Sequence, residues 1–224
     1  SHLKTYTFHE GTLPPDFSLD FEPAIFNLPE FFLMSESTGW LSFHLLNVRT
    51  KAAVASVHFN VSDGIARSPL KAPFGSIVCS YNINPQLVFD FLEDTESVLM
   101  KRGVKEIFLT NPPRAYASNT LSLLETFLLN QKYLVTNAET GSLIPVGETH
   151  FADRIRHSEM LRNKRARNAG LEFKRIAEKD ISEVYRFIFE CHKQKGYKIS
   201  INEMDLKNAV QSFPGRYLLF GIFY

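Results

Sequence analysis

The sequence predicts a mixed α/β fold, with a sheet that is partly antiparallel and flanked by helices. Two strand-like runs, residues 39–49 and 52–61, are separated only by Thr50-Lys51, which is typical of an antiparallel hairpin. Farther along the chain, short apolar runs alternate with longer segments of helical periodicity. Because antiparallel strands come first and strands then alternate with helices, we expect a mixed sheet with helices on both faces.

Turn residues and apolar spacing define the elements of the first half. Residues 22–36 have helical spacing interrupted by Pro29, and are predicted as one broken helix or two short ones. Asn84-Pro85 is typical of a helix start, and Gly103 of a helix end. After the hairpin we predict a loop at 68–75, a strand at 76–80, a helix at 85–102, a strand at 106–110, a helix at 118–130 and a strand at 132–137.

The second half is predicted to begin with a helix at residues 151–169, ended by Gly170. A second unit then opens as strand, helix, helix and strand, at residues 171–177, 181–195, 202–213 and 216–224. The chain stops in an apolar run, so we expect a fragment of a longer protein. The expected parts are a first lobe at 1–150, a basic helical linker at 151–170 and the first half of a truncated second lobe at 171–224.

The composition excludes several classes of protein. Hydrophobic residues make up 44% of the 224 and the formal net charge is +1, so general disorder and a uniformly basic nucleic-acid binder are both excluded. Cys79 and Cys191 are too few for a disulfide scaffold and are expected to be thiols in a reducing compartment. No apolar run approaches the ~20 residues that span a membrane, and no signal peptide is visible. We therefore expect a cytoplasmic protein with no membrane partner.

Three short stretches carry a resemblance to a known family. They are Ser68-Pro69 followed by Ala72-Pro73-Phe74-Gly75, His157-Ser158 with Arg162 and Arg165 ahead of Ala169-Gly170-Leu171, and the predicted helix 180–196 followed by the strand 217–224. Together with the order of elements, they resemble the acyl-CoA N-acyltransferase (GNAT) fold. The two-lobed arrangement is similar to that of the FemAB-like transferases and of a related group of two-lobed acetyltransferases.

This resemblance implies an enzyme that transfers an acyl group from CoA, or an aminoacyl group from aminoacyl-tRNA, to an amine on a small molecule or peptide. FemAB-like members add amino acids to peptidoglycan precursors. Acetyl-CoA or another acyl-CoA is implied as cosubstrate, with its pyrophosphate on a Q/R-x-x-G-x-G/A loop. At the matching place residues 79–85 read CSYNINP, which has no glycine and includes Pro85 without an N–H. We therefore expect any CoA site to lie beyond Tyr224.

The loop at residues 68–80 is the predicted substrate site. Pro69, Pro73 and Gly75 are turn-formers that would hold Phe74 beside the end of a central strand, where ligand clefts of mixed sheets lie. An ordinary turn with a core phenylalanine is the alternative. The residues predicted to bind substrate are Arg67, Pro73, Phe74, Gly75 and Ser80.

The linker region concentrates the positive charge of the chain. Residues 151–175 contain eight Lys and Arg against three acids, a net of +5, which leaves −4 for the remainder. At helical spacing these basic side chains point in all directions, as on a solvated helix. A more specific interpretation is that Arg162, Arg165 and Arg167 contact a phosphate or a tRNA backbone. Aromatic residues do not interleave with the charges, which argues against base reading.

The sequence identifies no catalytic residue and no metal site. There is no G-x-S-x-G nucleophile elbow, and N-acyl transfer requires only a proton acceptor for the amine and a backbone N–H for the carbonyl. His44 and His58 are potential cross-strand neighbours, but two histidines are too few for a metal site. The alternatives to an enzyme are a catalytically inactive GNAT-like binding module and a nucleic-acid-binding protein that acts through the basic linker.

Overall fold

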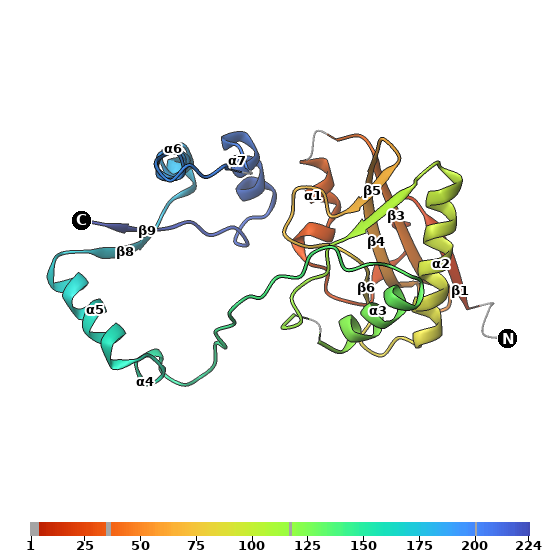
Figure 1. Ribbon diagram of the computed structural model, residues 1–224, viewed down its shortest axis with the longest axis horizontal. Coiled ribbons are helices and arrows are strands. Elements are labelled where there is room, and N and C mark those ends of the chain that lie inside the picture. Colours follow the sequence, from red (N-terminus) through yellow and green to blue (C-terminus); the bar gives the residue numbers. More distant parts are fainter. Residues whose placement is uncertain (1–4, 35–36, 117, 200) are drawn as a thin grey trace. The chain divides into compact units, whose positions relative to one another are not determined.

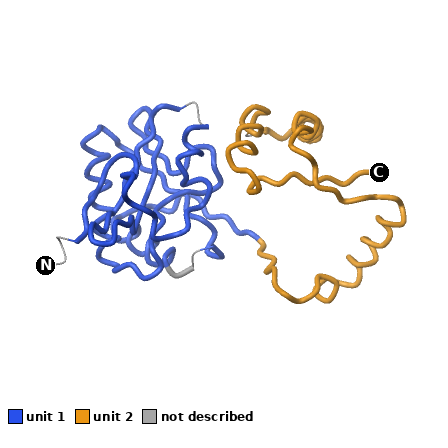
Figure 2. Tube along the Cα trace, turned by 180° about the vertical axis from the view of Figure 1, so that it is seen from behind, with its two compact units in different colours: residues 1–141 blue, residues 142–224 orange. Residues whose placement is uncertain are grey.

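The computed structural model describes residues 5–34, 37–116, 118–199 and 201–224, in two units (Figure 1). The first unit comprises residues 1–141 and the second residues 142–224 (Figure 2). The sequence-based boundary lay at residue 150, beyond the point where the two units separate. Most of the irregular segment between residues 131 and 150 is exposed to solvent.

A mixed sheet flanked by helices forms the first unit, as predicted. Its strands are β1 (Tyr6–Glu10), β2 (Ser18–Leu19), β3 (Trp40–Asn47), β4 (Ala52–Ser62), β5 (Ile65–Ser68), β6 (Val78–Cys79) and β7 (Glu106–Leu109). The main path runs β1-β3-β4-β5-β7, and every step along it is antiparallel except the parallel pair β5–β7. Its helices are η2 (Ile25–Asn27), α1 (Pro29–Leu33), α2 (Pro85–Lys101) and α3 (Ser118–Asn130).

β4 organises this sheet because both of its edges are used. β3 pairs with one edge along the predicted hairpin, in register from Trp40–Asn60 to Asn47–Ala52. The other edge takes β2, β6 and β5 in succession. Within the described residues, no strand pairs with Val57–Phe59 on that second edge, because the chain leaves the sheet after β5 and returns as β6.

Local signals set the position of α2. The Asn84 side chain accepts a hydrogen bond from the Gln86 N–H, Pro85 occupies the first helical position, and Gly103 adopts a φ of +82° just past the end. The side chains that this helix buries recur at helical spacing and comprise Val88, Phe91, Leu92, Thr95 and Leu99.

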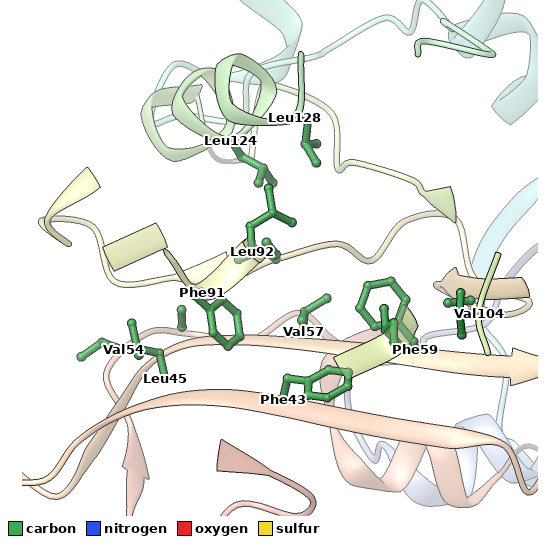
Figure 3. Packing of buried hydrophobic residues seen from close by; sticks show 14 residues of the cluster. Phe43, Leu45, Val54, Val57, Phe59, Phe91, Leu92, Val104, Leu124 and Leu128 are labelled. Atoms are coloured by element: carbon green, nitrogen blue, oxygen red, sulfur yellow. The ribbon is translucent and has the colours of Figure 1, made fainter. Parts of the chain in front are cut away.

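The apolar core lies between one face of the hairpin and the helices α2 and α3. Phe43, Val57 and Phe59 point to this face and are essentially inaccessible to solvent. Figure 3 shows Phe91 of α2 close to these strands, and Leu92 directed toward Leu124 of α3. In Figure 1, α1 lies on the opposite side of the sheet from α2.

Three sequence-based assignments differ from the structure. Residues 132–137, predicted as a strand, are irregular because only Tyr133 packs against the core, whereas Leu134 is 85% exposed. The strands β1 and β2 precede residue 22, where the first element was assigned. The predicted helix 151–169 is broken at residues 155–156 into α4 (Phe151–Arg154) and α5 (His157–Asn168).

The second unit follows the predicted order. After α4 and α5 come β8 (Glu172–Arg175), η3 (Glu178–Asp180), α6 (Ile181–Gln194), α7 (Glu203–Ser212) and β9 (Phe220–Phe223). β8 and β9 form an antiparallel pair. The buried side chains of this unit's apolar residues are those of Ile181, Ala209, Val210 and Phe213. Among the described residues of both units, no helix has the length and apolar character needed to cross a membrane.

Candidate functional site

The parallel strands β5 and β7 end side by side, and the loops that follow them form the candidate site. The Thr110 N–H donates to the Ser68 carbonyl at 2.9 Å, and the Gly75 N–H donates to the Thr110 carbonyl at 2.9 Å. The loop at residues 69–77 is thereby joined to the segment at residues 110–116. In sheets with parallel strands, ligands bind outside the carboxyl ends of those strands.

Close packing at Gly75 fixes the first of these loops. A Cβ atom at this position would lie 2.8 Å from the Pro69 nitrogen and 3.0 Å from the Ser68 hydroxyl, so any larger residue requires the neighbouring backbone to shift. The Ser76 N–H donates to the Ser68 hydroxyl at 3.0 Å, and Ser76 itself adopts a φ of +77°. The peptide bond between Ser68 and Pro69 is cis. The predicted rigid Pro-Phe-Gly loop therefore has a structural basis in its own contacts.

Phe74 belongs to an aromatic wall rather than to the apolar core. Its ring meets Phe26 edge-on at a centroid distance of 5.2 Å, and lies 5.6 Å from the ring of Tyr116. Tyr116 is 72% exposed, so the wall reaches solvent, and the neighbouring Pro73 is exposed as well. Tyr116 was not anticipated, because its contact with Phe74 depends on the pairing of β5 with β7 and leaves no local sequence signal.

Two other predicted residues lie apart from this wall. Arg67 is exposed on β5, and its guanidinium lies over the Phe108 ring at 4.6 Å from the centroid. Ser80 is buried after β6, where its hydroxyl lies 3.0 Å from an Asp20 carboxylate oxygen and its N–H donates to the Val54 carbonyl. The hydroxyl of Ser80 thus contacts Asp20 rather than the loop that carries Phe74.

A small apolar void lies between β6, the helices α2 and α3, and the loop after β7. The residues that line it come from β6, from both helices and from the loop after β7; they are Ile77, Cys79, Val88, Pro112, Thr120, Leu121 and Leu124. Its volume of about 20 Å³ holds roughly one water molecule. Burial raises the pKa of the Cys79 thiol to about 11, so this thiol is protonated at neutral pH.

Two unpartnered oxygens are buried beside residues of this lining. Ser76 Oγ and Asn111 Oδ1 have no hydrogen-bond partner among the described residues. Each belongs to the residue immediately before a lining residue, Ile77 and Pro112 respectively. A buried oxygen without a partner destabilises the fold, by about 1–3 kcal/mol, and such groups concentrate at functional sites.

The opposite face of the hairpin carries a ladder of histidines and serines. His44 Nδ1 is hydrogen-bonded to Ser56 Oγ at 2.7 Å, and His58 Nδ1 to Ser42 Oγ at 2.9 Å. The two imidazole rings are 5.5 Å apart, and His9 stacks on His44 at 6.2 Å. His44 and His58 are therefore the predicted neighbours. The serines were missed, although the pattern Ser-x-His occurs at both 42–44 and 56–58.

Burial keeps these two histidines neutral. It lowers the pKa of His58 to about 3, with a smaller effect from His44. It lowers the pKa of His44 to about 4, with a smaller effect from His9. Among the described residues, no group of three or more His, Cys, Asp or Glu side chains is placed to hold a metal ion.

The turn before α2 does not fit a CoA pyrophosphate. Such a group is held by free backbone N–H groups at a helix start. Here the Gln86 N–H is bound by the Asn84 side chain at 3.0 Å, and Pro85 has no N–H. The Ile83 N–H donates to the Ser80 carbonyl. The backbone N–H groups of Ile83 and Gln86 are thus already hydrogen-bonded within the turn and are not available to a phosphate.

The predicted anion-binding arginines lie in the second unit, on α5. Arg162, Arg165 and Arg167 are exposed, and the helix buries none of its residues. Arg162 pairs with Glu159 at 2.8 Å, but an exposed pair of this kind contributes little to stability. α5 is therefore a solvated basic helix whose charges are available to a phosphate.

A shallow groove of about 610 Å³ lies between α6 and α7 of the same unit. It is lined by Ser182, Glu183, Tyr185, Arg186, Phe189 and Glu203. The Glu203 carboxylate is bound by Lys207 and Ser182, which lower its pKa. Charges of both signs alternate along the groove, so it selects no one ligand chemistry.

Comparisons with protein-family models, with curated proteins and with solved structures found no match to this chain.

Proposed function

We propose that the first unit is an acyltransferase lobe, which passes an acyl or aminoacyl group from CoA or aminoacyl-tRNA to an amine. The observation that carries this proposal is the apolar void that β6, α2, α3 and the loop after β7 enclose, because that loop leaves the carboxyl end of the parallel pair β5–β7. Ligands of sheets with parallel strands bind outside the carboxyl ends of the strands, and ligand sites are mostly apolar. The mixed sheet flanked by helices supports the proposal at the level of fold class, although the strand expected at residues 132–137 is not formed.

The residues around the void and the aromatic wall have distinct roles in this proposal. Gly75 fixes the loop, and Phe74 with Tyr116 forms the wall against which the acceptor packs. The phenol of Tyr116 is the titratable group of that wall and is assigned to proton transfer at the amine or at the leaving group. The apolar void takes the first carbon atoms of the acyl chain, and its neighbours must move to admit more.

Filling the void tests this proposal. Acetyl-CoA and an aminoacyl-tRNA are each offered to the chain with a mixture of amines, and product is measured by mass spectrometry. Cys79→Phe places a ring in the void and is expected to lower turnover at least tenfold. Cys191→Phe makes the same change on α6 of the second unit and is the matched control. Absence of turnover from both donors, or equal activity of both variants, would contradict the proposal.

A catalytically inactive binding module of the same fold is the second candidate. It is favoured by the capped start of α2, where Asn84 and Pro85 leave no place for a pyrophosphate. In that case titration calorimetry shows no binding of acetyl-CoA or free CoA. An amine or peptide ligand then perturbs Phe74 and Tyr116 without any turnover.

A further inference from the structure

The face of the sheet beneath α1 is polar, although it is closed to solvent. The buried polar residues on it are His44 of β3 and Ser56, His58 and Asn60 of β4. Their cover is aromatic: Phe32 of α1 packs against the His58 ring at 4.6 Å and against Trp40 at 4.5 Å. Buried polar side chains are destabilising unless they are paired. The Nδ1 atom of each histidine is paired with a serine, but His44 Nε2 has no hydrogen-bond partner among the described residues.

Of the covering segment, the structure describes residues 21–34 and 37–38, and this segment is held at its two ends. On one side, the Asp20 N–H donates to the Ala53 carbonyl, and its carboxylate accepts from Ser80. On the other side, the Gly39 carbonyl accepts from the Val61 N–H at 2.7 Å. Between these two points, the Phe26 ring of the covering segment also packs against Phe74 at 5.2 Å, and lifting the segment would break this contact.

The covering segment is separate from the apolar core. Among its described residues, only Asn27 is buried, and the Oδ1 atom of Asn27 has no hydrogen-bond partner. The core cluster is built from the strands and from α2 and α3, and it includes no described residue of this segment. Lifting the segment thus exposes aromatic rings and histidines but leaves the core beneath α2 intact.

Among the described residues, no carboxylate acts on His44 or His58 as a counter-charge. His9, His44 and His58 follow one another across β1, β3 and β4, with ring distances of 6.2 and 5.5 Å. Arg67 of β5 lies on the same face, in register with Asn60, and is positive. Glu30 is the charged side chain of α1 and is exposed to solvent.

We propose that the stacked histidines form an acid-sensitive latch: when they bind protons, the covering segment lifts from the sheet while the core under α2 and α3 stays packed. Lifting admits water, which hydrates the charged rings and screens their mutual repulsion, so both effects favour the lifted state.

The direction of the effect follows from linkage. Both histidines have a pKa below 6.5 when the segment is closed, about 4 for His44 and about 3 for His58. Once lifted, each regains a pKa near 6.5, so the lifted state binds more protons as pH falls below that value. Between pH 7 and pH 5 the opening constant rises roughly 20-fold for each histidine, or about 500-fold for both. The rise ends near pH 3, where the closed state also binds protons.

The single tryptophan of the chain reports this motion directly, because Trp40 lies against Phe32. Emission and acrylamide quenching of Trp40 are recorded from pH 7.5 to pH 3 on the full chain, alongside far-UV circular dichroism. The proposal expects a red shift and stronger quenching at a higher pH than the loss of secondary structure. Coincident transitions would overturn it, since they would indicate plain unfolding.

Variants separate the latch from a general acid effect. In the double variant His44→Gln/His58→Gln, the shift of Trp40 emission is expected to disappear above pH 4, whereas His157→Gln on α5 leaves it unchanged. Phe32→Ala removes the ring contact and is expected to give the open-state emission already at neutral pH, with unchanged circular dichroism. Persistence of the acid shift in the double variant, or a closed-state spectrum for Phe32→Ala, would overturn the proposal.

Discussion

Substitution of Gly75 by alanine is expected to destabilise the first unit by about 2–4 kcal/mol and to displace Phe74. The added Cβ would stand 2.8 Å from the Pro69 nitrogen and 3.0 Å from the Ser68 carbonyl carbon and hydroxyl oxygen. Ordinary contacts of a Cβ atom begin near 3.4 Å, so backbone atoms on one side must move by about half an ångström. Overpacking of this kind costs about 1–3 kcal/mol.

The same movement strains two hydrogen bonds. The Gly75 N–H donates to Thr110, and the Ser76 N–H donates to Ser68. Each bond contributes about 0.5–1.5 kcal/mol, and partial loss of both completes the expected range. Because the Thr110 bond joins the two loops of the candidate site, its loss also moves Phe74 away from Tyr116.

Urea unfolding followed by Trp40 fluorescence and circular dichroism measures the change in free energy of unfolding. Gly147→Ala is the matched control: its added Cβ meets no atom within 4 Å, and a change below about 0.5 kcal/mol is expected. If Gly75→Ala were as stable as that control, the loop would be free to relax, and the rigid wall that supports the proposed function would not exist.

The remaining predictions concern separate elements. Asn84→Ala removes the cap of α2 and should lower stability by about 1 kcal/mol in the same urea assay. Phe59→Ala opens the core beneath α2 and should lower it by about 3–5 kcal/mol. If α5 binds single-stranded RNA, Arg165→Gln/Arg167→Gln should make the slope of log K against log salt shallower by about 1.4; an unchanged slope excludes these arginines as phosphate contacts. Alkylation of Cys79, followed by peptide mass spectrometry, should accelerate only as pH approaches about 11.

The elements that were predicted correctly are those whose signals are local. α2 has a cap, a proline and a terminal glycine within its own sequence, and its bounds of 85–101 nearly match the predicted 85–102. The hairpin likewise carries its turn between its own strands. By contrast, residues 132–137 have the apolar residues of a strand but no neighbouring strand to pair with among the described residues. Strand formation depends on that partner as much as on propensity.

Of the parts of the candidate site, only the Pro-Phe-Gly loop was singled out from the sequence. The Pro-Phe-Gly loop is visible in the sequence because its residue types restrict the backbone. The contact of Tyr116 with Phe74 and the void beside Cys79 form where segments distant in the chain pack together. The residue spacing within each of these segments does not predict such contacts. Ser80 belongs to the predicted loop by sequence, yet the return of the chain as β6 turns its hydroxyl toward Asp20.

In the hairpin, the alternation of apolar and polar residues predicts the two faces correctly but does not predict that the polar face is also buried. Phe43, Val57 and Phe59 alternate with Ser42, His44, Ser56 and His58, which ordinarily indicates one buried face and one solvated face. Here the covering segment closes the polar face as well. A solvated histidine exchanges protons with little effect on folding, whereas a buried one must remain neutral for its surroundings to stay closed. Because carboxylates are absent from the described contacts of these histidines, the proposed latch predicts that closure of this face depends on pH, whereas the packing of the opposite face does not.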